Sequence, residues 1–169
     1  LWAFWGREVF AWNSFTIGVT LSAYGILIAA VQAGLLPQLT KRLGDYKTLM
    51  FSSMAAIIAL IAFGFSTAAW AVAIVIPIAA LSDMAPPLLT AVAANKVADD
   101  QQGLVQGVIA SLASVAAVLA PLVLTGVFEQ FVNNKGLYFP GAPFFIAAVL
   151  IIAIIPLMLC LNPRRILRS

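Results

Sequence analysis

The sequence predicts an all-α membrane protein, a polytopic bundle of transmembrane helices, on three observations. Hydrophobic residues make up 63% of the 169 residues and charged residues only 9%, against roughly 25% in an ordinary soluble domain. Several long stretches carry no charge at all, among them residues 9–40, 48–82, 101–128 and 136–163. These stretches do not alternate apolar and polar residues as the strands of a membrane barrel do. A chain this apolar cannot cover its surface with charge, so we expect it to lie in lipid.

The positions of the first two helices are predicted from the charged residues that interrupt the apolar sequence. Residues 1–6 are apolar and aromatic and precede Arg7 and Glu8, so we expect them to be the end of a helix that starts before the sequence given. A complete span needs about 20 apolar residues to cross roughly 30 Å of hydrocarbon. The stretch up to residue 40 therefore holds the first complete helix, expected at about 14–36.

The remaining four helices are placed by the same criterion. The stretch 48–82 is too long for one span and breaks at Ser66 and Thr67, just before Trp70. We therefore expect the other helices at about 47–65, 70–93, 104–128 and 143–161. The third complete helix then continues through Asp83.

The distribution of basic residues predicts the orientation in the membrane. With five spans, one side collects seven basic residues, whereas the other side collects only Arg7 and Lys135. The seven are Lys41, Arg42, Lys47, Lys96, Arg164, Arg165 and Arg168. Cytoplasmic loops are enriched in such residues, so we expect a multi-pass protein of the cell's inner (plasma) membrane with a cytoplasmic C-terminus. The aromatic residues expected at the outer boundary are Trp2, Trp5, Trp12, Trp70, Tyr138 and Phe139.

The chain lacks the residues that most enzymes and metal sites use. It contains no histidine, and Cys160 is its one cysteine. This composition excludes histidine-based acid–base catalysis, most zinc sites and an internal disulfide. We therefore expect no enzymatic activity, no metal, no cofactor and no nucleic-acid partner.

Asp83 is the ionisable residue that lies well inside a predicted span, and it is followed by Pro86 and Pro87. A lone charge there costs several kcal/mol, so Asp83 must be protonated, face water or find a partner. One interpretation is a proton-coupling carboxyl. The alternative is a neutral Asp83 bonded to a serine or to a backbone carbonyl that the prolines release. The prolines themselves indicate either a broken helix that lines a cavity or a simple kink.

Other polar residues within the spans are candidate ligand contacts. Gln32 lies late in the first complete span, where an amide binds a polar ligand or joins helices. Gln106, Ser111 and Ser114 lie in the fourth. Small residues recur every fourth position at Gly25, Ala29 and Ala33, and again at Gly103, Gly107 and Ser111. This spacing favours close helix packing, or a sliding surface between two halves of a transporter.

The stretch from Gly34 to Lys47 resembles the short cytoplasmic loop motif of the major facilitator superfamily. The motif-bearing residues are Gly34, Lys41, Arg42, Gly44, Asp45 and Lys47. With Gly44 on the second glycine of the motif, Arg42 matches, and Asp45 and Tyr46 replace a basic pair. Flanking cations and a tight turn at Gly44 are expected to hold two helix ends at the cytoplasmic surface.

A closer resemblance covers essentially the whole chain and concerns the tetracycline-resistance antiporter group. It rests on segments 10–13, 17–27, 87–91, 102–107 and 138–144, together with Gln32. The resemblance implies helices eight to twelve of a twelve-helix transporter, preceded by the end of helix seven. This chain departs from the tetracycline exporters at two positions. Those exporters carry a histidine in helix eight and an aspartate in helix nine, where this chain has Ile28 and Ala56.

These observations lead to two expectations about function. The first is the C-terminal half of a secondary transporter that expels a small amphipathic or drug-like molecule by proton antiport and alternating access. Its partners are the lipid bilayer, an N-terminal six-helix half, the substrate and protons. Gln32, Gln106, Ser111 and Ser114 contact the substrate, and Asp83 carries the proton. The alternative is a helical subunit that acts in assembly of a membrane complex and transports nothing.

Overall fold

A computed structural model of the chain describes residues 1–95, 97–133 and 138–160. This part is helical, without a strand, so the predicted all-α class is confirmed. Five of its helical segments are long and apolar enough to cross a membrane. The elements are α1 (Trp2–Phe10), α2 (Ser14–Ala30), the π-helical turn η1 (Val31–Leu35), α3 (Leu36–Leu43), α4 (Asp45–Phe65), α5 (Ala69–Ser82), α6 (Ala85–Ala94), the 3₁₀ turn η2 (Asp99–Gln101), α7 (Gln102–Asn133) and α8 (Ala142–Cys160).

The first complete span extends beyond its predicted end at residue 36 and continues to Leu43. The helix begins at Ser14 because the side chain of Asn13 accepts the N–H of Thr16 at 2.8 Å, which caps the first turn. It passes Pro37 because the N–H of Leu36 bonds to the carbonyl of Val31, an extra residue back along the chain. This wider turn places Pro37 in the first turn of α3, where a missing N–H costs little.

A sharp turn at Gly44 separates α3 from α4. Gly44 has a φ of 81°, a region that residues with a Cβ rarely adopt. Lys41 and Arg42 lie in the last turn of α3, and Asp45 lies in the first turn of α4. Each charge therefore has the sign that the dipole of its own helix end favours.

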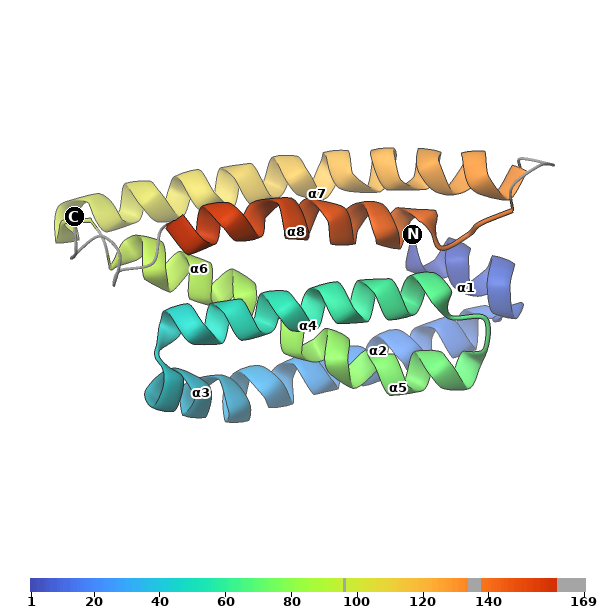
Figure 1. Cartoon of the computed structure of the whole chain (residues 1–169), viewed down its shortest axis with the longest axis horizontal. Helices are drawn as coiled ribbons and strands as arrows, with labels where there is room; N and C mark the ends of the chain where they lie inside the picture. Colours follow the sequence, from blue (N-terminus) through green and yellow to red (C-terminus); the bar gives the residue numbers. More distant parts are fainter. Residues whose placement is uncertain (96, 134–137, 161–169) are drawn as a thin grey trace.

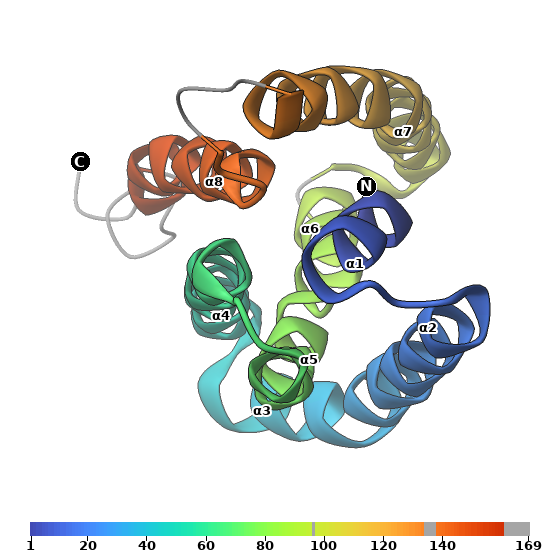
Figure 2. The same cartoon turned by 90° about the vertical axis from the view of Figure 1, so that its right-hand side faces the viewer.

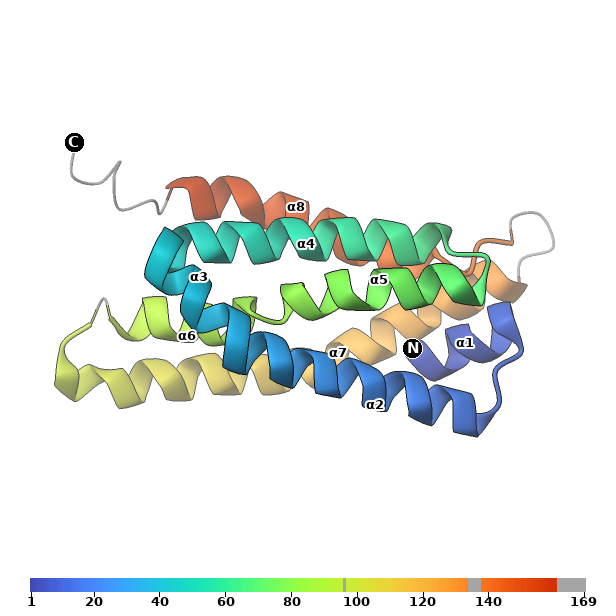
Figure 3. The ribbon, with the colours of Figure 1, turned by 90° about the horizontal axis from the view of Figure 1, so that it is seen from below.

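The helices run roughly along one long axis, and their connections lie at its two ends, apart from the break between α5 and α6 near the middle (Figures 1 and 3). Helix α4 packs against both α5 and α8. The view along the bundle shows α2 and α7 on the side away from α4 (Figure 2). In the most apolar windows of those two spans no residue is buried, so the apolar surfaces of these helices are exposed in this structure.

Aromatic rings fill the end of the bundle where α1 and the first turns of α5 and α8 meet. Trp5 is 1% exposed, and its ring lies 5.0 Å from the rings of both Phe10 and Phe144, centroid to centroid. Phe63 of α4 packs against Trp2 and Trp5 in the same cluster. The tryptophans predicted near one membrane boundary thus include a buried core residue as well as the 70% exposed Trp70.

Two glycines allow α4 and the start of α8 to touch at this end. A Cβ placed on Gly141 would lie 2.1 Å from the carbonyl oxygen of Gly64. A Cβ on Gly64 would lie 2.3 Å from the ring of Phe145. A side chain larger than that of glycine therefore does not fit at either position without a shift of its neighbours.

The remaining helices differ from their predicted bounds at their ends. Helix α1 continues past residue 6 to Phe10, and α7 runs from Gln102 to Asn133 rather than from 104 to 128. Lys96, Lys135, Arg164, Arg165 and Arg168, on which the predicted orientation partly depends, lie outside the described residues.

Candidate functional site

The third complete span is broken between α5 and α6, and its two consecutive prolines explain why. In a continuous helix the carbonyls of Ser82 and Asp83 would accept the N–H groups of residues 86 and 87. Pro86 and Pro87 have no N–H. They occupy the first turn of α6, where none is needed. The predicted helix at 70–93 is therefore two helices, joined by a turn at Asp83 and Met84.

Gln32 supplies the donor that Pro87 lacks. Its side-chain nitrogen, Nε2, donates to the backbone carbonyl oxygen of Asp83 at 2.9 Å. A carbonyl left unpaired in an apolar setting costs about 1–3 kcal/mol, so this bond stabilises the break. Of the two roles expected for Gln32, the structure shows the contact between helices. Its side chain is nevertheless exposed.

The side chain of Asp83 has a partner of its own on the same span as Gln32, in α2. The hydroxyl of Tyr24 donates to Oδ2 of Asp83. A carboxylate that accepts a hydrogen bond is less costly in an apolar environment than an isolated one. Tyr24 was missing from the sequence-based site, although its spacing was a usable signal. It precedes Gln32 by eight residues, and residues about two turns apart share one face of a helix.

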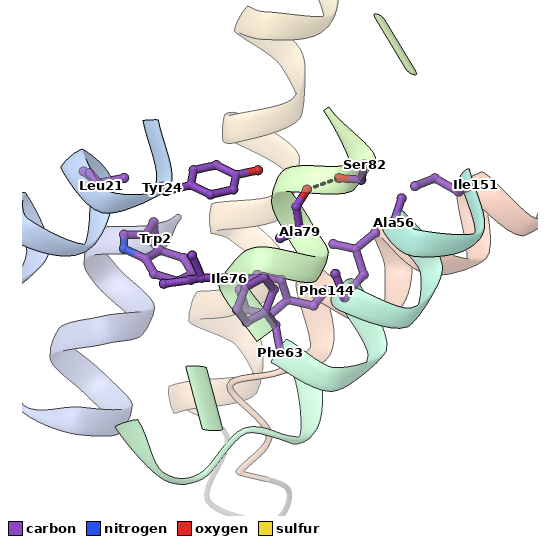
Figure 4. A pocket seen from close by; sticks show the side chains of 12 residues that line it. Trp2, Leu21, Tyr24, Ala56, Phe63, Ile76, Ala79, Ser82, Phe144 and Ile151 are labelled. Carbon is purple, nitrogen blue, oxygen red and sulfur yellow. Dashed lines mark hydrogen bonds between the residues drawn. The ribbon is translucent and has the colours of Figure 1, made fainter. Parts of the chain in front are cut away.

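A cavity of about 290 Å³ lies beside this contact and is lined by residues of α1, α2, α4, α5 and α8. Figure 4 shows Trp2, Phe63 and Phe144 around it, with Tyr24 and Ser82 toward one end. Ala56, which stands where the resemblance implied an aspartate, is among the lining residues. The cavity is therefore mainly apolar and aromatic.

The other predicted ligand residues lie on α7. Gln106, Ser111 and Ser114 are all exposed. The hydroxyls of Ser111 and Ser114 each donate at 2.8 Å to a carbonyl of their own helix, those of Gly107 and Ala110. The structure thus joins Gln32 to Asp83, whereas these serines bond within α7.

The predicted loop motif is spread over three elements. Gly34 lies in the π-helical turn η1, Lys41 and Arg42 end α3, and Asp45 and Lys47 begin α4. The three basic side chains are exposed. They therefore form a cationic rim at the α3–α4 end of the molecule.

One further polar contact lies at the opposite end, outside the spans. The hydroxyl of Tyr138 donates to Oε1 of Glu8 at 3.2 Å. Desolvation and the bond to this carboxylate raise the pKa of Tyr138. Within the residues that the structure describes, no group of three histidine, cysteine or acidic side chains is placed to hold a metal ion.

Comparison with known proteins gives the chain its relatives. It is 32% identical over 129 residues to tetracycline resistance protein, class G, of Vibrio anguillarum, covering 76% of this chain and 33% of that protein. It is 28% identical over 156 residues to the class C protein of Escherichia coli, covering 92% and 38%. It is also 26% identical over 161 residues to hippocampus abundant transcript-like protein 1 of Homo sapiens, covering 86% and 32%.

The chain thus spans about a third of the length of the curated relatives it matches. No family model and no solved structure matches it. The helical fold, the five apolar spans and these relatives agree with one another. They confirm that the chain is related to the tetracycline-resistance group of the major facilitator superfamily.

Proposed function

We propose that the chain is the C-terminal transmembrane half of a secondary transporter that exports a small amphipathic molecule in exchange for protons. Export is supported by the tetracycline resistance proteins among its relatives. The observation that carries the mechanism is the hydrogen bond from Tyr24 to Asp83, which links α2 to a titratable carboxyl at the junction of α5 and α6.

The proposed partner within the same protein is an N-terminal six-helix half. The exposed faces of α2 and α7 support this part of the proposal. Both faces carry glycine and other small residues at four-residue spacing, which permits close helix packing in a membrane. A substrate path between two halves would then pass close to Gln32, Gln106, Ser111 and Ser114, all of which are exposed.

The charge on Asp83 offers a physical means of coupling. While Asp83 is a carboxylate, its bond from Tyr24 is charge-assisted, and such bonds are roughly twice as strong as neutral ones. Protonation removes the charge and weakens the connection between α2 and the α5–α6 junction. The bond from Gln32 to the backbone carbonyl does not depend on that charge. A proton therefore loosens one of two connections and shifts the balance between conformations.

The decisive experiment compares Asp83→Asn with the wild type in inverted vesicles that contain the full-length transporter. Uptake of tetracycline and of a panel of lipophilic dyes is driven by an imposed pH gradient, and substrate exchange is measured without a gradient. We expect Asp83→Asn to lower gradient-driven uptake by about tenfold or more while exchange persists. Glu129→Gln removes an exposed carboxylate on α7 and serves as the matched control.

Two results would contradict the proposal. Normal gradient-driven uptake by Asp83→Asn would show that the proton is carried elsewhere. Failure of the wild-type protein to move any compound of the panel, although it is inserted in the membrane, would favour the assembly subunit.

A further inference from the structure

The cavity beside Tyr24 is walled by aromatic rings and small side chains from several helices. Trp2, Phe63 and Phe144 contribute rings from α1, α4 and α8. Ala56 and Ala79 contribute only methyl groups from α4 and α5, which leaves the central space open. Figure 4 shows these side chains around the same space. The cavity is thus formed by the fold of this chain alone and not by a single exposed helix face.

Its size limits the occupant. The volume is about 290 Å³. An apolar cavity of about 150 Å³ holds one benzene ring, and drug-sized ligands occupy roughly 300–1,000 Å³. The cavity therefore suits a molecule of two fused aromatic rings.

The polar groups in its wall disfavour an anionic occupant. None of the lining residues carries a charge. The Nε1 of Trp2 donates to Oγ1 of Thr20 at 3.2 Å, and the hydroxyl of Ser82 donates to the carbonyl of Ala79 at 2.6 Å. An anion that entered would lose its hydration without a compensating partner. A neutral occupant therefore suits the wall better than an anion does.

The same groups can accept one hydrogen bond. The hydroxyls of Tyr24 and Ser82 use their protons toward Asp83 and Ala79. A hydroxyl oxygen that donates still has lone pairs for an incoming donor. Both residues lie toward one end of the cavity (Figure 4). An occupant with a single O–H or N–H at its edge would direct that group there.

We infer that this cavity is a binding site for a small, uncharged, two-ring aromatic molecule with one hydrogen-bond donor. The inference goes beyond the proposed transport function, because the site can be tested by equilibrium binding to the protein without any transport. The occupant would lie against Tyr24 and thus next to the bond that holds Asp83.

The test measures equilibrium binding of 1-naphthol to the full-length protein in nanodiscs of neutral lipid, with empty nanodiscs subtracted. We expect saturable binding at one site with a Kd of about 10–100 µM, the range that small ligands of this size reach. Naphthalene, which lacks the donor, should bind more weakly. The 1-naphthoate anion should bind at least about tenfold more weakly than 1-naphthol.

Two cavity-filling variants locate the site. Ala79→Leu and Ala56→Leu place extra methyl groups in the cavity from two different helices, and each should weaken 1-naphthol binding by about tenfold or more. Ala117→Leu makes the same change on the exposed surface of α7 and should bind as the wild type does. Thermal unfolding of each variant shows that it is folded.

Wild-type affinity in both folded cavity-filling variants, or no saturable binding to the wild type, would overturn the inference. Preferential binding of the anion would overturn it as well. The binding test does not use the transport assay, so failure of this inference and failure of the proposed function can be told apart.

Discussion

At the scale of single residues, the α5–α6 break is stabilised by a side-chain N–H that replaces a missing backbone N–H. Pro87 cannot donate to the carbonyl of Asp83, and the amide of Gln32 donates to it instead. Tyr24 makes the second connection, through the carboxylate. The two contacts differ in kind, since only the one through Tyr24 depends on the protonation of Asp83.

The role assigned to Gln32 can be tested with a double-mutant cycle. Gln32→Leu should lower the free energy of unfolding by about 1 kcal/mol, because the carbonyl of Asp83 loses its partner. In a Pro87→Ala background the alanine N–H at position 87 can serve that carbonyl, so the same substitution should cost less than half as much. The measurement is denaturant unfolding of the purified protein in detergent micelles.

Gln38→Leu, which removes an exposed amide from α3, is the control and should change stability little in either background. An equal cost of Gln32→Leu with and without Pro87 would show that the amide acts in some other way.

At the scale of elements, the α4–α8 contact depends on two glycines that face one another. Gly141 and Gly64 meet backbone to backbone. Neither partner can move aside as a flexible side chain would. Helix α4 contacts both α5 and α8, so this contact also positions one wall of the cavity.

Gly141→Ala should therefore destabilise the bundle. The added methyl group would lie 2.1 Å from the carbonyl oxygen of Gly64, and overpacking of this kind costs about 1–3 kcal/mol. We expect a lower midpoint of thermal unfolding, which can be measured by the tryptophan fluorescence of the purified protein.

Gly126→Ala provides the comparison, because a Cβ there meets nothing within 4 Å. That substitution should leave stability unchanged or raise it by up to about 1 kcal/mol. Unfolding of both variants at the same temperature would contradict the close contact between Gly141 and Gly64.

At the scale of the whole molecule, the two ends of the bundle differ in chemistry. The α3–α4 end carries Lys41, Arg42 and Lys47, and the opposite end carries the aromatic cluster with Trp2 and Trp5. Basic residues accumulate on the cytoplasmic side of membrane proteins. The arrangement therefore favours a cytoplasmic α3–α4 turn.

Cysteine labelling tests this orientation in intact cells. In a Cys160→Ser background, Tyr138→Cys should react with a membrane-impermeant maleimide added from outside. Leu43→Cys, an exposed residue next to the Gly44 turn, should react only after the membrane is permeabilised. Reaction of Leu43→Cys in intact cells, with none at Tyr138→Cys, would reverse the orientation.

The sequence by itself determined the class of the protein and the approximate places of its helices. Composition and unbroken apolar runs suffice for this, because lipid offers backbone polar groups no partner and a long apolar run satisfies them by forming a helix. It also singled out Asp83, Gln32 and the paired prolines, because a polar group or a missing N–H is conspicuous in an apolar span. The resemblance to tetracycline antiporters rested on segments 10–13, 17–27, 87–91, 102–107 and 138–144 together with Gln32, and it is supported by the relatives found.

Only the tertiary structure decided which of these residues meet. The contacts of Asp83 join positions 59 and 51 residues apart in the chain, and nothing local specifies such pairs. The spacing of Tyr24 and Gln32 was visible, but a tyrosine in an apolar span has many other uses. The π-helical turn that carries the first span past Pro37 was missed because a proline predicts a helix end unless the preceding turn widens. The cavity was also beyond the sequence, because its walls come from five helices whose packing alone brings those side chains together.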